Sequence, residues 1–418
     1  MRISGAHTCD IIKRITCRSH FEPHKQTPSH IQDPEGALID QVMVVFHPGP
    51  HSYTGEDLCE ISCHGNPIIV DKILDLIRQT GLARMAEKGE FTKRAFLSGK
   101  MDLVQAEAVG ALVNAGSIIG FEMAQALLQG ELSDRIKAIS SSIAGILAEI
   151  EASFITEEAD IPEHTILIRI ENLAGQIEGL LADTKAASPL YEGVRTTIAG
   201  LPNVGKSSLF NAILGYQRAI VHHEEGTTRD VLRERLRLGG IDFLFHDTAG
   251  IRETSSGPEK IGVDKTIESL KNSALVLYVV DAREGLKPQE TQWLTLSERT
   301  IVVMNKIDLI HGEITDVPGW KTIPVSAKFN IGIEGLFECM REAFPQERPM
   351  VFLERHAYLL GRAHFCLKAC QEALGSGYTA DVVTIDLKAA LVHLKQITGQ
   401  SFDEDILERI FSGFCIGK

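Results

Sequence analysis

The feature that most constrains the fold is an eight-residue loop, Gly200-Leu-Pro-Asn-Val-Gly-Lys-Ser207, between an apolar strand-like run ending at Ala199 and a helix-like run beginning near Ser208. The glycine spacing and the final Lys-Ser pair are typical of a phosphate-binding loop. In such a loop, backbone N–H groups and the N-terminus of the following helix point at phosphate oxygens. We therefore expect Lys206 to reach the β- and γ-phosphates of a nucleotide and the Ser207 hydroxyl to ligate Mg²⁺.

Two segments further along the chain indicate which nucleotide is bound. Phe243–Gly250 is an apolar strand ending in Asp-x-x-Gly, where Asp247 would hold Mg²⁺ through water and the Gly250 N–H would meet the γ-phosphate. Thr300–Asp308 is an apolar strand ending in Asn-Lys-x-Asp, and its Asp308 carboxylate can accept two hydrogen bonds from guanine N1–H and the 2-amino group. Adenine lacks that pair of donors, so the pattern predicts GTP rather than ATP.

A further segment, Ile323–Lys328, resembles the loop that contacts guanine O6. Each segment alone could be a strand end followed by a turn. Together they occur in the order of a GTPase, each at the carboxyl end of a strand, which favours a GTP site. The residues expected to contact GTP are Asn203, Val204, Gly205, Lys206, Ser207, Ser208, His222, His223, Glu224, Glu225, Gly226, Thr227, Thr228, Asp247, Thr248, Ala249, Gly250, Asn305, Lys306, Ile307, Asp308, Ser326, Ala327 and Lys328.

Length and composition limit the class of protein. The 418 residues suggest two to four domains. We expect no membrane span, because no apolar run is long enough, and no signal peptide at the Met-Arg-Ile-Ser-Gly start. Eight cysteines without framework spacing favour a reducing cytoplasm. The net charge of −14 argues against a basic nucleic-acid binder, so an RNA substrate would require a local basic patch or a partner.

The pattern along the chain predicts a multidomain fold that combines α/β and all-α parts. Residues 1–97 mix short strands and helices, and 98–193 are helical. Residues 194–345 alternate strands and helices, as in a doubly wound α/β domain with a phosphate-binding loop, and 346–418 are helical again. The economical arrangement is one helical domain built from both flanks, with the GTPase domain inserted in it.

Alternation along residues 58–64 separates two faces of a predicted strand. Cys59 and Cys63 share one face with Ile61, so the cysteines are expected in a core. Glu60 and His64 share the other face with Ser62. A zinc site made by Cys59, Cys63 and His64 is disfavoured, because His64 points the opposite way. Nearby, Pro67–Gln79 has the apolar spacing of a helix.

The C-terminal segment Ile410–Lys418 closely resembles that of the bacterial and organellar tRNA modification GTPases of the MnmE, or TrmE, family. Further segments carry the same resemblance: Arg2–Gly5, Phe46–Pro50, Tyr53–Asp57, Cys63–Gly65, Gly89–Leu97 and Lys100–Ala108. The resemblance covers almost the whole chain. It implies a folate-binding N-terminal domain, a helical domain and an inserted GTPase domain.

The same resemblance implies a cytoplasmic homodimer that works with the flavoprotein MnmG, also called GidA. Together they would install a carboxymethylaminomethyl- or aminomethyl-type group at carbon 5 of the wobble uridine in certain tRNAs. The one-carbon unit would come from 5-formyl-tetrahydrofolate or a related tetrahydrofolate. GTP hydrolysis would be activated by potassium-dependent dimerisation of the GTPase domains.

The resemblance also assigns residues to sites. It implies folate contacts at Arg2, Glu60, Lys100 and Lys418, Mg²⁺ ligands at Ser207 and Thr228, and K⁺ ligands at Asn203, His222, Glu224 and Thr227. Ile251 follows Asp-x-x-Gly, where many small GTPases carry a water-orienting glutamine, so K⁺ would supply positive charge instead. Glu259 would position the attacking water through a second water, unless it is a solvated carboxylate at a helix start. Cys415 is a tentative nucleophile or acid/base, with a packed terminal residue as the alternative.

The chain departs from the family pattern in three places. It begins at Arg-Ile-Ser-Gly, where relatives usually carry additional residues, so the folate site or the dimer is expected to be incomplete. Ser153–Glu158 replaces the usual Asp-Phe-Pro-Glu-Glu, and the first half of the loop His222–Asp230 is unusually charged. Two other functions stay open: a ribosome-assembly GTPase switch that binds RNA, and a folate-dependent one-carbon transferase with a regulatory GTPase.

Overall fold

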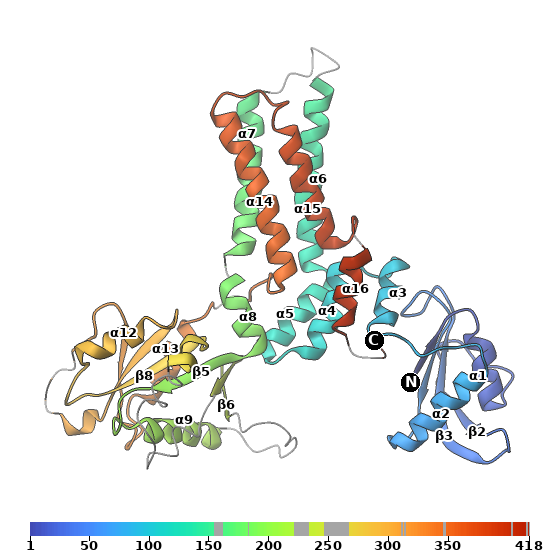
Figure 1. Cartoon of the computed structure of the whole chain (residues 1–418), viewed down its shortest axis with the longest axis horizontal. Helices are drawn as coiled ribbons and strands as arrows, with labels where there is room; N and C mark the ends of the chain where they lie inside the picture. Colours follow the sequence, from blue (N-terminus) through green and yellow to red (C-terminus); the bar gives the residue numbers. More distant parts are fainter. Residues whose placement is uncertain are drawn as a thin grey trace. The chain divides into compact units, whose positions relative to one another are not determined.

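The computed structural model describes residues 1–418 except 154–161, 183, 221–233, 246–266, 311, 313–314, 346–347, 403, 415–416 and 418 (Figure 1). The chain combines α/β and helical parts and divides into two compact units. The first unit comprises Met1–Asn114, Ala124–Ile177 and Tyr358–Lys418, and the second comprises Ala115–Met123 and Glu178–Ala357. Among the described residues, no helix combines the length and apolar character needed to cross a membrane.

The first unit contains a four-stranded antiparallel sheet in the order β1-β4-β3-β2. Its elements, with the two helices that cover it, are β1 (Arg2–Ser4), α1 (Thr8–Thr16), β2 (Thr27–Gln32), β3 (Leu38–His47), β4 (Leu58–Ser62) and α2 (Pro67–Gln79). One sheet face packs on α1 and α2, where Ile11, Ile61 and Ile73 are buried. The other face carries polar side chains, because successive residues of a strand point to opposite sides.

The cysteines of this region lie where the alternation places them. Cys59 is fully buried in the core, and Cys63 packs against it. Burial raises the pKa of the Cys59 thiol to about 12, which opposes the thiolate form that metals bind. His64 instead directs Nδ1 at the buried Asp40 carboxylate at 2.7 Å. In the described part of the chain, no cluster of His, Cys, Asp or Glu is arranged to hold a metal ion.

Helix α2 has the bounds that its apolar spacing predicts. Asn66 caps it by accepting a hydrogen bond from the Ile68 N–H at 2.9 Å, and Pro67 takes the first helical position, where no intrahelical N–H bond is lost. Such a cap stabilises a helix by about 1 kcal/mol. The helix buries Ile73 and Ile77 against the sheet. Local chemistry therefore fixes both the start and the buried face of this element.

The flanks of the chain contribute the remaining helices. They are α3 (Glu90–Leu97), α4 (Leu103–Asn114), α5 (Ile118–Gln129), α6 (Glu131–Ser153), α7 (Glu163–Leu181), α8 (Thr184–Glu192), α14 (Glu354–Gly375), α15 (Thr384–Thr398) and α16 (Glu404–Ser412). Figure 1 shows α15 lying along α6, although the two are far apart in sequence. Helix α16 packs on α3 and α4 through Phe96, Leu103, Leu407 and Phe411. Gly399 ends α15 at φ 77°, and a Cβ there would lie 2.7 Å from the Phe96 ring.

The second unit contains a six-stranded sheet in the order β10-β9-β8-β5-β7-β6, parallel except for the β6–β7 pair. Its elements are β5 (Val194–Ala199), α9 (Lys206–Ile220), β6 (Glu234–Leu238), β7 (Ile241–Phe245), β8 (Leu275–Asp281), η2 (Pro288–Glu290), α12 (Thr291–Leu294), β9 (Thr300–Asn305), η3 (Ile307–Leu309), β10 (Lys321–Pro324) and α13 (Ile333–Glu342). Strand β8 is buried along its whole length, as expected for a central parallel strand. The parallel strands β5, β8 and β9 end at one edge of the sheet, where the sequence motifs lie.

Candidate nucleotide-binding site and N-terminal cavity

The phosphate-binding loop joins β5 to α9 and depends on two glycines. Gly200 has φ 141°, and a Cβ there would lie 2.2 Å from the Val279 carbonyl oxygen of β8. Gly205 has φ 99°, and its Cβ would lie 2.3 Å from the Asn305 side-chain nitrogen. No side chain fits at either position. The loop therefore lies directly against the ends of β8 and β9.

Lys206, the first residue of α9, turns its side chain back over the loop. Its Nζ donates to the Gly200 and Leu201 carbonyl oxygens at 2.9 and 2.8 Å. Burial lowers the pKa of Lys206, because desolvation disfavours the charged form. Ser207 and Ser208 follow in the first turn of the helix, where both are exposed. An ammonium and a helix N-terminus thus converge on one spot, as anion binding requires.

Asn305 connects the three motifs of this sheet edge. Its side-chain nitrogen donates to the Val204 carbonyl at 2.9 Å, and its side-chain oxygen accepts from the Ala327 N–H at 3.1 Å. Asn305 is only 2% exposed, so both bonds are shielded from water. The phosphate-binding loop, the end of β9 and the Ser-Ala-Lys loop are thereby held at fixed distances from one another.

Asp308 lies beside this junction. The Ser326 hydroxyl donates to Asp308 Oδ1 at 2.6 Å, which orients the half-buried carboxylate. Ile307 opens the short 3₁₀ turn that carries Asp308. Lys328 is exposed, and its ammonium lies 5.1 Å from the centre of the Phe329 ring. A rigidly placed carboxylate next to a phosphate-binding loop has the geometry to read the edge of a nucleotide base.

Lys306 links the phosphate-binding loop to the end of β8. Its Nζ donates to the Asn203 carbonyl at 2.5 Å and to Asp281 Oδ2 at 2.9 Å. Hydrogen bonds from Arg283 first, and then from Lys306, hold the pKa of the Asp281 carboxyl well below its usual range. The Asp281–Arg283 pair was not predicted from the sequence. The feature that could have indicated it is Asp281, an acidic residue at the end of an apolar strand. Both residues line a cavity of about 290 Å³ beside Asn203.

Part of the predicted site lies outside the described residues. These residues are His222, His223, Glu224, Glu225, Gly226, Thr227, Thr228, Asp247, Thr248, Ala249, Gly250, Glu259, Cys415 and Lys418. The structure therefore describes the loop residues and the base-side residues of the predicted GTP site. It also locates the residue predicted as a K⁺ ligand in the loop, Asn203, which has φ 63° and is exposed.

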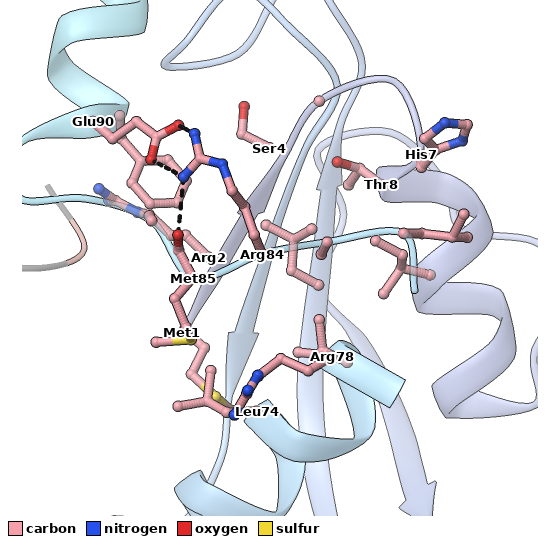
Figure 2. Close-up of a pocket in the computed structure, with 18 of the residues that line it drawn as sticks. Met1, Arg2, Ser4, His7, Thr8, Leu74, Arg78, Arg84, Met85 and Glu90 are labelled. Atoms are coloured by element: carbon pink, nitrogen blue, oxygen red, sulfur yellow. Dashed lines mark hydrogen bonds and ion pairs between the residues drawn. The ribbon is translucent and has the colours of Figure 1, made fainter. Parts of the chain in front are cut away.

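The first unit holds a separate cavity of about 390 Å³ along the edge of β1 (Figure 2). Four arginines and one glutamate are among its lining residues, which gives a formal charge of +3 (four minus one): Arg2, Arg78, Arg84, Arg94 and Glu90. Gly417, from the C-terminal segment, also lines it. The cavity is large enough for a small ligand, and its four arginines, each already paired with a carboxylate, have further N–H donors for an anionic one.

Of the residues predicted to contact folate, the structure brings two together. Arg2 lines this cavity, and its Nε donates to Glu60 Oε1 at 2.8 Å. Lys100 is exposed and lies elsewhere, with its Cγ 3.6 Å from where a Cβ at Gly55 would be. Neither Glu60 nor Lys100 lines the cavity itself.

Glu90 anchors the wall of the cavity between two arginines. It pairs with Arg84 through both oxygens, at 2.7 and 2.8 Å, and with Arg94 at 2.7 Å (Figure 2 shows the Arg84 contact). Arg94 also reaches Glu56 at 2.9 Å. Burial alone would raise the pKa of Glu90, but the hydrogen bonds from Arg84, the Glu87 N–H and Arg94 lower it to about 2. The sequence did not reveal this network, which forms only when loop and helix meet.

Replacing Glu90 with glutamine should destabilise the first unit by about 1–2 kcal/mol at pH 7, since it leaves Arg84 and Arg94 without their shared carboxylate. Because the folded state depresses the pKa of Glu90, its contribution is fully present above pH 4.5 and is lost as the pH falls through about 2. Urea unfolding of both proteins at several pH values checks this. A difference between them that stays constant down to pH 2 would contradict it.

Comparisons with known proteins agree across the whole chain. A family model described as MnmE helical domain matches residues 103–415, and one described as GTP-binding protein TrmE N-terminus matches residues 1–100. Among solved structures, the G domain of FeoB from Methanococcus jannaschii is similar to 36% of this chain, over 97% of the FeoB chain, at 24% identity. The TM-score of 0.27 is too low to support an argument about function.

Curated relatives named tRNA modification GTPase MnmE match 100% of the chain. The relative from Akkermansia muciniphila is 39% identical and is covered over 95% of its length. The relatives from Carboxydothermus hydrogenoformans and Aquifex aeolicus are 39% and 37% identical, each covered over 96%. Identity at this level over full length, together with the GTP-site geometry, shows that this chain is a GTP-hydrolysing enzyme that belongs to the tRNA modification GTPase MnmE family.

Proposed function

We propose that this chain is the GTP-hydrolysing subunit of a system that modifies the wobble uridine of certain tRNAs at carbon 5, adding a carboxymethylaminomethyl- or aminomethyl-type group. It would act as a homodimer with the flavoprotein MnmG, in the cytoplasm. The observation that carries the proposal is the Asn305 junction, which joins the phosphate-binding loop to Asp308 and Ser326. The junction supports the proposal because it fixes the Asp308 carboxylate, which would read guanine, beside the loop that would bind phosphate.

In this proposal, some residues bind the guanine base and others bind the phosphates and Mg²⁺. Asp308 accepts from guanine N1–H and the 2-amino group, while the loop that contains Ser326, Ala327 and Lys328 faces O6. Lys206 exchanges its two carbonyl partners for phosphate oxygens, which is favourable because a charged acceptor makes the stronger bond. The Ser207 hydroxyl and Thr228 supply oxygen ligands of the kind that Mg²⁺ prefers, and Asp247 holds the ion through water. When bound, Mg²⁺ neutralises charge on the phosphates.

We assign activation of hydrolysis to a potassium ion and a second copy of the GTPase domain. Asn203 offers an exposed side-chain oxygen at the loop, with His222, Glu224 and Thr227 as the other ligands. Ile251 cannot orient water, so Glu259 would hold the attacking water through a second one. A bound K⁺ supplies the positive charge that an arginine finger supplies elsewhere.

GTP hydrolysis should be at least about tenfold faster in potassium than in sodium buffer, and Asn203→Gly should remove that difference. Glycine keeps the left-handed backbone of Asn203 and deletes only the ligand. Asn330, another exposed left-handed asparagine of this unit, gives a matched control as Asn330→Gly, which should retain the difference. Equal rates of the wild type in both salts would contradict the potassium site.

A reduced folate, such as 5-formyl-tetrahydrofolate, is proposed to bind at Arg2 and Glu60, with Lys100 and Lys418 as further contacts. Two observations support this: the Arg2–Glu60 pair on the sheet and the basic cavity that Arg2 borders. The carboxylates of a folate complement the arginines of that cavity. Gly417 on its lining brings the C-terminal segment close, so Cys415 is proposed to act there as nucleophile or acid/base.

Mass spectrometry of tRNA nucleosides tests the whole proposal. A deletion strain should lack the modified wobble uridine and regain it with the wild-type chain, but not with Lys206→Ala. Unchanged nucleosides in the deletion strain, with altered ribosome assembly, would favour the ribosome-assembly alternative.

A further inference from the structure

A row of polar side chains crosses the N-terminal sheet on the face opposite its core. The strand register pairs Glu60 with both Arg2 and Val45, so His47, two residues after Val45, lies on the same face. Arg2 Nε donates to Glu60 Oε1 at 2.8 Å, and His47 Nε2 lies 4.0 Å from Glu60 Oε2. On its other side, His47 Nδ1 lies 3.0 Å from His24 Nδ1. Two histidines therefore extend the Arg2–Glu60 pair.

The backbone holds His24 in place for this contact. His24 has φ 59°, in the left-handed region that only a few per cent of non-glycine residues adopt, asparagine, aspartate and histidine more often than the rest. Its N–H donates to the Phe46 carbonyl at 2.8 Å, and Pro23 bridges to Phe46 as well. The two imidazole rings consequently meet with centroids 5.1 Å apart and planes tilted by 57°. Such an unfavourable conformation persists only where surrounding bonds fix it.

The need for one donor and one acceptor in each hydrogen bond determines which ring nitrogens of His24 and His47 carry a proton. A bond between two imidazole nitrogens needs one N–H and one lone pair. An ionised Glu60 can only accept, so the nitrogen of His47 that faces it must be the donor, Nε2–H. Neutral His47 then carries its lone pair on Nδ1 and accepts from His24 Nδ1–H. A shift of about 1 Å in either partly exposed side chain turns the 4.0 Å separation into a hydrogen bond.

We propose that His47, with its tautomer fixed by His24, is a positioning residue for Glu60. Arg2 donates to one oxygen of Glu60 and His47 lies 4.0 Å from the other, so the remaining lone pairs are available to a ligand that presents two N–H donors. The pterin ring of a reduced folate presents such a pair. This inference rests on the folate part of the proposed function and adds two residues to that site, because neither histidine was singled out from the sequence.

Calorimetric titration with 5-formyl-tetrahydrofolate tests the two histidines with paired variants. His47→Phe keeps a ring but removes the donor, whereas His47→Gln keeps a donor near the place of Nε2. His24→Gly keeps the left-handed backbone but removes the ring, whereas His24→Asn tolerates that backbone and keeps a donor near Nδ1. We expect His47→Phe and His24→Gly to bind about tenfold more weakly, and the Gln and Asn variants to bind as the wild type does.

His30→Phe is the matched control. His30 is exposed on β2 of the same sheet, and its side chain makes no hydrogen bond or ion pair with the other described residues. It should bind the folate like the wild type. If His47→Phe also binds like the wild type, the inference is wrong while the folate site stands. If the wild-type chain hydrolyses GTP but binds no folate, the folate part of the proposed function fails, and the inference fails with it.

Nitrogen-15 NMR of the histidine rings gives a readout that needs no ligand and applies to the wild type and to the variants. Near pH 8, His47 should carry its proton on Nε2 and His24 on Nδ1. His24→Gly should allow His47 to populate both tautomers, whereas His30→Phe should not change them. A His47 ring protonated on Nδ1 in the wild type would overturn the inference, because Nε2 could then not donate to Glu60.

Discussion

Gly205→Ala is expected to abolish tight GTP binding, whereas Gly215→Ala, inside the helix α9 that follows the loop, should leave it intact. The Cβ of an alanine at 205 would lie 2.3 Å from the Asn305 side-chain nitrogen, on a backbone with φ 99°. Asn305 would have to move, and its bonds to Val204 and Ala327 would break. The phosphate-binding loop would then lose its fixed distance from the guanine-reading loop.

The expected loss is at least about a hundredfold in GTP affinity. A left-handed conformation costs a residue with a side chain about 1–3 kcal/mol, and each buried polar group left unpaired costs about 1–3 kcal/mol more. Titration with a fluorescent GTP analogue measures the affinity. At Gly215, no described heavy atom lies within 4 Å of the new Cβ, and alanine favours the helix by about 1 kcal/mol. Equal affinity of the two variants would contradict the close packing of loop and strand.

This glycine illustrates how far the sequence alone predicts the site. The loop and the strand before it follow from local patterns, so their place at the edge of the sheet was predictable. The same holds for Asn305 and Asp308, which end a continuous apolar run. The contact partner of Gly205 was not predictable, because it comes from a strand far along the chain. The motif spacing identifies Gly205 as a loop glycine, but only the packing of the folded chain shows why a larger residue does not fit there.

Charged contacts were the least predictable part. The sequence placed Lys306 among the GTP contacts, and the structure also makes it a brace between the Asn203 carbonyl and Asp281. Asp281 and Arg283 pair two residues apart at a strand end, where no periodic signal applies. Glu90 pairs with Arg94 one turn along its own helix, but also with Arg84 of the preceding loop, whose position the core sets. The pairing of His24 with His47 likewise depends on an unusual backbone conformation at His24.

Asp308→Asn should exchange guanine for xanthine as the preferred base. A carboxylate accepts from both guanine N1–H and the 2-amino group, whereas an amide offers one acceptor and one donor. Xanthine carries a carbonyl oxygen in place of the 2-amino group and therefore matches the amide. The Ser326 hydroxyl, 2.6 Å from Asp308 Oδ1, can bond the amide oxygen in the same way and direct the NH₂ group at the base.

Affinity for GTP should fall by about a hundredfold or more, because two hydrogen bonds to a charged group are replaced, and affinity for XTP should rise. Competition titrations with both nucleotides measure the exchange. Asp281→Asn makes the same chemical change at another acidic residue of this sheet edge, but Asp281 bonds Lys306 and Arg283 rather than facing the base. Asp281→Asn should weaken the binding of GTP and XTP equally, because the phosphate-binding loop loses the support of the Lys306–Asp281 bond while the contacts to the base persist. An Asp308→Asn variant that still prefers GTP would place guanine recognition elsewhere.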